Sequence, residues 1–144
     1  MLRRATPEDA IKVADVFRRS FGTLTFLPTL HTPDEDRQHF ARVVAEQEVW
    51  VSERYGRIVG FAALSRDELT YLYVAPEEQG RRVGTALLEL VKQQRPDGFK
   101  LWVFQRNIRA RRFYELRGCR LLELTEGRGN EEQEPDALYE WRPT

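Results

Sequence analysis

Cysteine, histidine and long apolar runs are scarce in this chain of 144 residues. The single cysteine, Cys119, excludes a disulfide framework and a cysteine metal site, so we expect a small buried side chain there. No cluster of His, Cys and Asp has metal-ligand spacing. No segment approaches the ~18–20 apolar residues of a membrane span, and the first residues lack a secretory apolar core. We therefore expect a cytoplasmic protein with no metal site.

Net charge is also lacking, because 23 Lys and Arg balance 23 Asp and Glu. A dedicated nucleic-acid binder usually has a basic excess, so this balance argues against one. The charges are nevertheless uneven: residues 81–120 hold eleven Lys and Arg against three acids, whereas residues 121–140 hold seven acids against one arginine. Solvated surfaces explain each single charge, but the two blocks favour an anionic and a cationic ligand at neighbouring places.

Apolar spacing and turn residues predict a single α/β domain over residues 1–144, with a mixed sheet of about seven strands flanked by helices. The expected order is β-α-α-β-β-β-α-β-α-β-β. Strand–helix–strand units at the centre predict parallel pairing, and hairpins predict antiparallel pairing at the flanks. We expect strands at residues 2–5, 49–54, 58–64, 68–74, 100–104, 121–124 and 137–141, and helices at 7–21, 33–46, 84–94 and 108–117.

A glycine-containing loop separates the strand ending at Val74 from the helix expected at 84–94. Such a loop presents unpaired backbone N–H groups and the positive end of the helix dipole, which suit an anion. It has no Walker lysine and only two of the three glycines of a dinucleotide-binding fingerprint. The loop therefore predicts an anion site of another kind, while a glycine turn that only caps a structural helix stays open as the alternative.

Two segments, taken together, resemble the GNAT superfamily of N-acetyltransferases. Leu72–Leu88, LYVAPEEQGRRVGTALL, is similar to the family's strand, its Arg/Gln-x-x-Gly-x-Gly/Ala loop and the following helix. Asn107–Cys119 is similar to the family's Asn-x-x-Ala-x-x-Phe-Tyr-x-x-x-Gly-Phe block. Arg82 departs from the pattern, since it stands where the family most often has the middle glycine, and Cys119 replaces the usual phenylalanine. The expected element order agrees with the family's fold.

The resemblance implies an enzyme that moves the acetyl group of acetyl-CoA to a primary amine by direct attack, through a tetrahedral intermediate. A backbone N–H near Val74 would stabilise the oxyanion, and Tyr114 would protonate the departing thiolate as general acid. The implied cofactor-binding residues are Leu72, Tyr73, Val74, Gln79, Gly80, Arg81, Arg82, Val83, Gly84, Thr85, Asn107 and Tyr114.

The general base and the acceptor site are less well defined by the sequence. Glu68 falls where some branches of the family carry a catalytic glutamate, although a solvated acid at a strand end explains it equally well. Tyr71 and Tyr73, passing the proton through ordered water, are the alternative. Acceptor residues, for a small-molecule or peptide amine, are expected in the loop between the first two helices, in the central strand and in the acidic segment: Phe26, His31, Tyr71, Asn130 and Glu131.

Two other functions are compatible with the sequence. One is a non-catalytic module that binds or senses acetyl-CoA. The other is a nucleic-acid-binding domain that uses the arginines of residues 106–112, which the neutral total charge disfavours. A homodimer also fits the resemblance, because small acyltransferases of this type are often dimers. The sequence does not identify the acceptor amine.

Overall fold

The computed structural model describes all residues 1–144 and has one seven-stranded sheet in the spatial order β1-β2-β3-β4-β5-β7-β6. The strands are β1 (Leu2–Arg4), β2 (Glu48–Arg54), β3 (Arg57–Ser65), β4 (Glu68–Val74), β5 (Phe99–Phe104), β6 (Arg120–Leu124) and β7 (Asp136–Trp141). The helices are α1 (Ala10–Phe21), α2 (Pro33–Glu46), α3 (Val83–Gln94) and α4 (Ile108–Leu116), with short 3-10 turns η1 (Pro7–Asp9) and η2 (Pro76–Glu78). The predicted α/β class, strand number and element order are confirmed.

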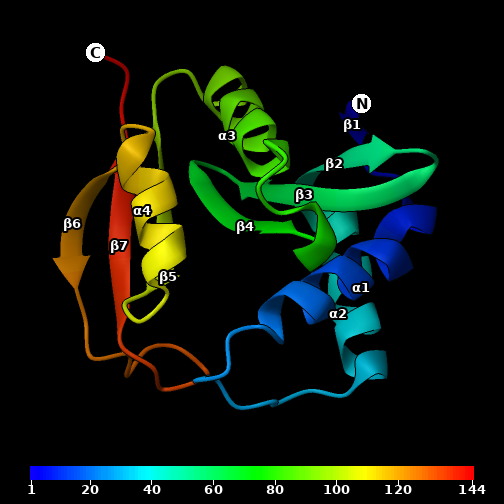
Figure 1. The fold of residues 1–144 in the computed structure, drawn as a ribbon, viewed down its shortest axis with the longest axis horizontal. Helices are drawn as coiled ribbons and strands as arrows, with labels where there is room; N and C mark the ends of the chain where they lie inside the picture. The colour runs from blue at the N-terminus through cyan, green and yellow to red at the C-terminus, as the bar shows by residue number, and fades with distance from the viewer.

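The sheet is mixed in the way the sequence predicts, since β4 and β5 pair parallel and every other pair of neighbours is antiparallel. β4 and β5 share a single pair of Cα partners, Glu68 and Lys100. From that pair the two strands diverge toward Val74, as Figure 1 shows. We call this divergence the fork.

Helices cover both faces of the sheet. On one face α1 and α2 bury Val13 and Phe40 against β3 residues such as Phe61, and on the other α3 packs Leu87 and Leu88 over the sheet beside α4. Gly60 lies where α3 crosses β3: a Cβ atom there would stand 2.9 Å from Val83 Cγ1. The missing side chain therefore allows the start of α3 to approach the sheet closely. No helix combines the length and the apolar character that crossing a membrane requires.

A reciprocal pair of hydrogen bonds starts α2. The Glu35 N–H donates to Thr32 Oγ1 at 3.2 Å, and the Thr32 N–H donates to Glu35 Oε1 at 2.8 Å. This capping box satisfies backbone donors that a helix N-terminus leaves without partners. It fixes where the loop between α1 and α2 ends, and that loop forms one wall of the site described below.

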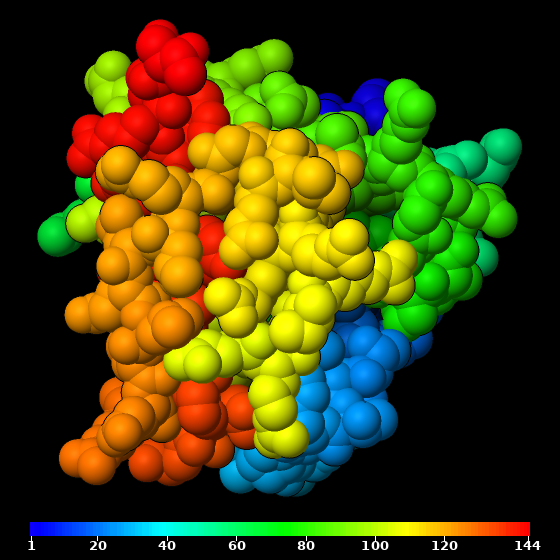
Figure 2. Space-filling view, turned by 60° about the vertical axis from the view of Figure 1, so that its left-hand side comes forward, coloured from blue at the N-terminus to red at the C-terminus, as the bar shows by residue number.

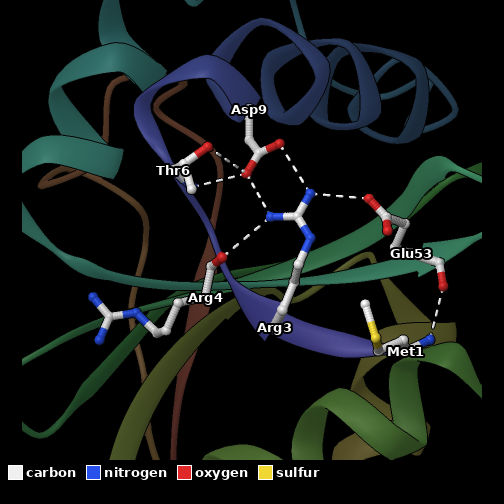
Figure 3. Close-up of polar contacts among 6 residues, drawn as sticks. All are labelled: Met1, Arg3, Arg4, Thr6, Asp9 and Glu53. Atoms are coloured by element: carbon white, nitrogen blue, oxygen red, sulfur yellow. Dashed lines mark hydrogen bonds and ion pairs between the residues drawn. The ribbon is translucent and has the colours of Figure 1, made fainter.

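Arg3 joins the first strand to η1 and β2 (Figure 3). Its guanidinium donates to both carboxylate oxygens of Asp9, at 2.8 and 3.1 Å, and to Glu53 at 2.9 Å. The Thr6 N–H donates to the same Asp9 carboxylate at 2.8 Å. These donors, Arg3 above all, lower the pKa of Asp9 to about 2. The short edge strand is thereby tied to the rest of the domain.

Candidate active site

The loop between β4 and α3 has free backbone donors, as the sequence predicts. None of the N–H groups from Gly80 to Thr85 donates a hydrogen bond within the protein, and the first helical bond runs from the Ala86 N–H to the Arg82 oxygen at 3.0 Å. Arg81 and Arg82 are exposed beside these donors. Free N–H groups at the positive end of a 12-residue helix, with two cations nearby, are suited to an anion.

Arg82 immediately precedes α3 in a left-handed backbone conformation, with φ 66° and ψ 13°. A residue with a Cβ atom pays about 1–2 kcal/mol for this conformation, whereas glycine adopts it freely. The local geometry thus explains why glycine suits this position. The arginine keeps the loop geometry at the cost of backbone strain.

Side chains tie the same loop to β4 and to α4. Gln79 Nε2 donates to the Val74 carbonyl at 3.3 Å, while Gln79 Oε1 accepts from Arg109 at 2.8 Å. The Thr85 hydroxyl accepts from Arg117 at 2.9 Å. These bonds hold the loop at one orientation against both elements, so its N–H groups are positioned before any ligand binds.

Val74 turns its backbone polar groups toward the fork. The Ala75 N–H donates to the Val59 carbonyl at 2.8 Å, and Val74 lies opposite Gly60 in the antiparallel register. Because hydrogen-bonding direction alternates along an antiparallel strand, the N–H and C=O of Val74 point away from β3. The same alternation applies to Leu72. β5 has diverged at this level, so no neighbouring strand pairs with this edge of β4, where the Val74 carbonyl accepts from Gln79 Nε2.

Tyr114, on α4, is buried in the core cluster between α3, α4 and the sheet. Its hydroxyl has no hydrogen-bond partner in the protein, and no unpartnered polar side-chain atom is fully enclosed, so the hydroxyl meets open space. Burial raises the pKa of Tyr114 well above the usual 10, and the nearby Tyr73 raises it further. The phenol is therefore protonated at neutral pH. Asn107 caps the same helix by accepting from the Ala110 N–H at 3.2 Å.

A cavity of about 700 Å³ lies on the opposite face, between α1, α2 and the fork. Both strands of the fork contribute to it, β4 through Tyr71 and Tyr73 and β5 through Trp102 and Phe104. Its charged lining consists of acids and bases from α1, α2 and the loop between β6 and β7: Arg18, Glu35, Asp36, Arg42, Glu131 and Glu132. Aromatic walls with a charged rim are suited to a ligand that has both an apolar stem and a charged end.

Two loops from distant parts of the chain form one wall of this cavity. His31 Nε2 lies 2.6 Å from Glu131 Oε1, which joins the α1–α2 loop to the acidic segment before β7. Arg106 donates to the Phe26 carbonyl at 3.4 Å and lies 4.6 Å from the centre of the Phe26 ring. Figures 1 and 2 show the α1–α2 loop, in blue, against the orange-red segment. Of the acceptor residues expected from the sequence, His31, Tyr71 and Glu131 thus line one cavity.

Phe26 and Asn130 do not line this cavity. Phe26 packs edge-on against Phe104, with ring centroids 6.2 Å apart. The Asn130 amide donates to the Glu134 carbonyl at 2.7 Å and to Asp136 at 3.1 Å, so it holds its own loop together. It borders a neighbouring pocket of about 620 Å³ instead. Both residues therefore support the segments that form the cavity wall and do not contact the cavity themselves.

Glu68 lies away from the cavity as well, although the sequence makes it a candidate base. It is exposed at the start of β4, where β4 and β5 are still paired and no gap exists between them. Six residues of extended chain, or about 20 Å, separate it from Val74 at the open end. The structure therefore does not bring Glu68 to the place where Tyr114 and Val74 meet the fork.

His39 also lines the cavity, although the sequence gives no reason to select it. Its Nε2 lies 2.7 Å from the Tyr71 hydroxyl. Burial, and then the nearby Arg42, lower the pKa of His39, so the imidazole is neutral at pH 7. Its partner is 32 residues away in the chain, and a lone histidine in a helix gives no sign of such a contact.

Comparison with known proteins identifies the family of the chain. A family model described as an acetyltransferase (GNAT) domain matches residues 45–118, just over half of the chain. The chain is 30% identical over 99 residues to the peptidyl-lysine N-acetyltransferase YiaC of Escherichia coli (strain K12). That alignment covers 68% of this chain and 66% of the relative, slightly less than two thirds of its length.

Solved structures share the fold over nearly the whole chain. A GCN5-related N-acetyltransferase from Rhodopseudomonas palustris superposes with a TM-score of 0.82 at 25% identity, covering 99% of this chain and 95% of the other. The PaiA N-acetyltransferase of Thermoplasma acidophilum, solved in complex with coenzyme A, gives 0.77 at 17% identity, covering 99% and 98%. The chain belongs to the GNAT family of acetyltransferases.

Proposed function

We propose that the protein transfers the acetyl group of acetyl-CoA to a primary amine, and that the two substrates meet in the fork between β4 and β5. One arrangement supports the proposal. The loop with free N–H groups and the protonated phenol of Tyr114 lie toward one face of the sheet, and the cavity with the charged rim lies on the other face. Between them, β4 and β5 diverge. Each face of the sheet thus presents groups that suit a different substrate.

The residues around the loop fit the phosphates and the arm of acetyl-CoA. The free N–H groups from Gly80 to Thr85 suit the pyrophosphate, and Arg81 and Arg82 would add positive charge. The free edge of β4 at Leu72 and Val74 suits the amide-containing pantetheine arm as an added strand. Acetyl-CoA supplies the acetyl group as a thioester.

Two groups at the open end of the fork would assist the chemistry. The Val74 N–H would donate to the oxygen that gains negative charge when the amine attacks. Tyr114 would donate its proton to the departing thiolate, because its raised pKa keeps it protonated. We propose that Tyr73, which lies between these elements and the cavity, helps to orient both substrates.

The charged rim favours an acceptor with a cationic amine. Glu35, Asp36, Glu131 and Glu132 outnumber Arg18 and Arg42 at the cavity. A lysine-like amine of pKa about 10.4 needs about 4–5 kcal/mol to exist as the free base at pH 7, whereas an α-amine of pKa about 8 needs about 1–1.5. Since one relative is named a peptidyl-lysine N-acetyltransferase, lysine peptides are the first acceptors to test.

A thiol-release assay with acetyl-CoA and a panel of amines tests the proposed function. The panel contains lysine peptides, peptides with a free α-amine and blocked lysine, and small amines. We expect amine-dependent release of CoA and an acetylated amine in the product. Tight binding of acetyl-CoA without turnover on any amine would contradict the proposal and indicate a binding or sensing module.

A further inference from the structure

Tyr71 and His39 form a pair inside the acceptor cavity, and neither has a role in the anion site. The Tyr71 oxygen lies 2.7 Å from His39 Nε2, and both side chains line the cavity. Their rings pack edge-on with centroids 6.0 Å apart, and Phe40 contacts both. The surrounding aromatic rings fix the positions of the two polar groups, so their contact is part of the packed structure.

Titratable and charged groups surround this pair from several elements. On α2 itself, Asp36 raises the pKa of His39 and Arg42 lowers it. From the two loops, Glu131 raises that pKa and His31 lowers it. Burial has the largest effect and leaves His39 neutral at pH 7.

The acids also act on Tyr71. After burial, Glu132, Asp36 and Glu131 each raise the pKa of the phenol. The Tyr71 hydroxyl is therefore protonated while His39 is neutral. With the imidazole proton on Nδ1, His39 Nε2 accepts a hydrogen bond from the Tyr71 O–H. This pairing has the polarity that proton transfer toward His39 requires.

We propose that Tyr71 and His39 are a proton relay that deprotonates the acceptor ammonium, with Tyr71 contacting the nitrogen and His39 Nε2 taking the proton. The inference rests on the proposed function. It assigns the role of general base to His39 on α2, acting through Tyr71 on β4, and gives Glu68 no role in the proton transfer.

The transfer balances within the pair. An N–H bond of the ammonium breaks as an O–H bond forms on Tyr71, and the former Tyr71 O–H bond breaks as an Nε2–H bond forms on His39. The amine keeps the electron pair it needs for attack, Tyr71 is regenerated, and His39 becomes an imidazolium. One positive charge leaves the nitrogen and one appears on the imidazole, so the cavity's total charge does not change. His39 is half-buried and can return its proton to solvent.

The pH dependence of kcat/KM with a lysine peptide tests the relay. For the unmodified enzyme we expect activity to rise as pH increases through the His39 pKa, which lies below 6.5, because protonated His39 cannot accept a proton. In His39→Gln this acid limb should vanish, and kcat near pH 7 should fall about 10²-fold. The chain has two histidines, so His31→Gln is the matched control and should keep the acid limb.

The pKa of the amine distinguishes a relay from structural damage. With an amine whose pKa lies below the assay pH, His39→Gln and Tyr71→Phe should lose far less turnover than with the lysine peptide, which also shows that both variants are folded. With the lysine peptide both should be slow near pH 7 and recover as the pH approaches 10. The double variant should be no slower than the slower single variant, because both residues serve one step.

Several results would overturn the relay without affecting the proposed function. They are an acid limb that persists in His39→Gln, a limb that disappears only in His31→Gln, and equal losses for amines of high and low pKa. By contrast, absence of turnover in the unmodified enzyme with every amine would count against the proposed function itself.

Discussion

Glu68 and Lys100 are the only residues whose Cα atoms pair between β4 and β5, and the sheet opens from that point toward Val74. The divergence of β4 and β5 from this pair determines the geometry of the candidate site. It frees the edge of β4 at Leu72 and Val74, and it lets the cavity between α1 and α2 reach both strands. Two substrates that approach from opposite faces can then meet without crossing a closed sheet.

Removing the Tyr114 hydroxyl tests its proposed role as proton donor. In Tyr114→Phe we expect kcat to fall about 10²–10⁴-fold, the usual range for loss of a general acid, with little change in acetyl-CoA affinity. Tyr139→Phe is the matched control, because the Tyr139 hydroxyl bonds Glu115 and Arg111 instead. That variant should lose stability and keep its turnover. Equal turnover in Tyr114→Phe and the unmodified enzyme would remove Tyr114 from the mechanism.

Glu68→Gln tests whether Glu68, at the closed end of the fork, acts as the general base. Since Glu68 is exposed at the closed end, we expect kcat and KM for a lysine peptide to stay within about twofold, as is usual for surface substitutions. A steady-state assay across pH 6–9 measures this. A loss comparable to that of a general base would mean that Glu68 acts on the amine after all.

Arg82→Gly should stabilise the protein. Glycine removes a left-handed strain of about 1–2 kcal/mol but adds backbone freedom to the unfolded chain, so we expect a net gain of about 0.5–1 kcal/mol in the free energy of unfolding. Arg82→Ala keeps the strain and loses the charge. Urea unfolding of both variants separates the two effects, and a gain shared by alanine would refute the backbone explanation.

The Arg3–Asp9 pair should make stability depend on pH in acid. Because folding lowers the Asp9 pKa from near 3.8 to about 2, the ionised carboxylate stabilises the fold above pH 3.8, and this contribution is lost as pH falls toward 2. Asp9→Asn should therefore cost about 2 kcal/mol at pH 7 and almost nothing near pH 2. Asp15→Asn is the control, since Asp15 pairs with Arg19 on the exposed side of α1. A difference for Asp9→Asn that does not depend on pH would contradict this account.

Local signals in the sequence were sufficient for the order of elements. Thr32 and Glu35 lie three residues apart, and their capping box depends on nothing beyond that spacing. Gly80 and Gly84 likewise marked the loop before α3, and the structure shows free N–H groups there. Features of this kind are predictable because the interacting groups are close in the chain.

The composition of the proposed acceptor site was not predictable in the same way. Tyr71 and His39 meet only because α2 folds over β4, and Asn130 turns inward because Glu134 and Asp136 satisfy its amide. Glu68 became a candidate from its position in the family pattern, but the pairing of β4 with β5 decides what it faces. Each of these outcomes depends on contacts between distant segments.

Initial rates measured while both acetyl-CoA and a lysine peptide are varied test the central claim most directly. If the two substrates meet in the fork, the protein must hold both at once, so reciprocal plots should intersect and no acetylated enzyme should form without amine. Cys119 is buried and its pKa is raised to about 11, which disfavours it as a carrier of the acetyl group. Parallel plots, together with acetylated protein in the absence of amine, would contradict the account.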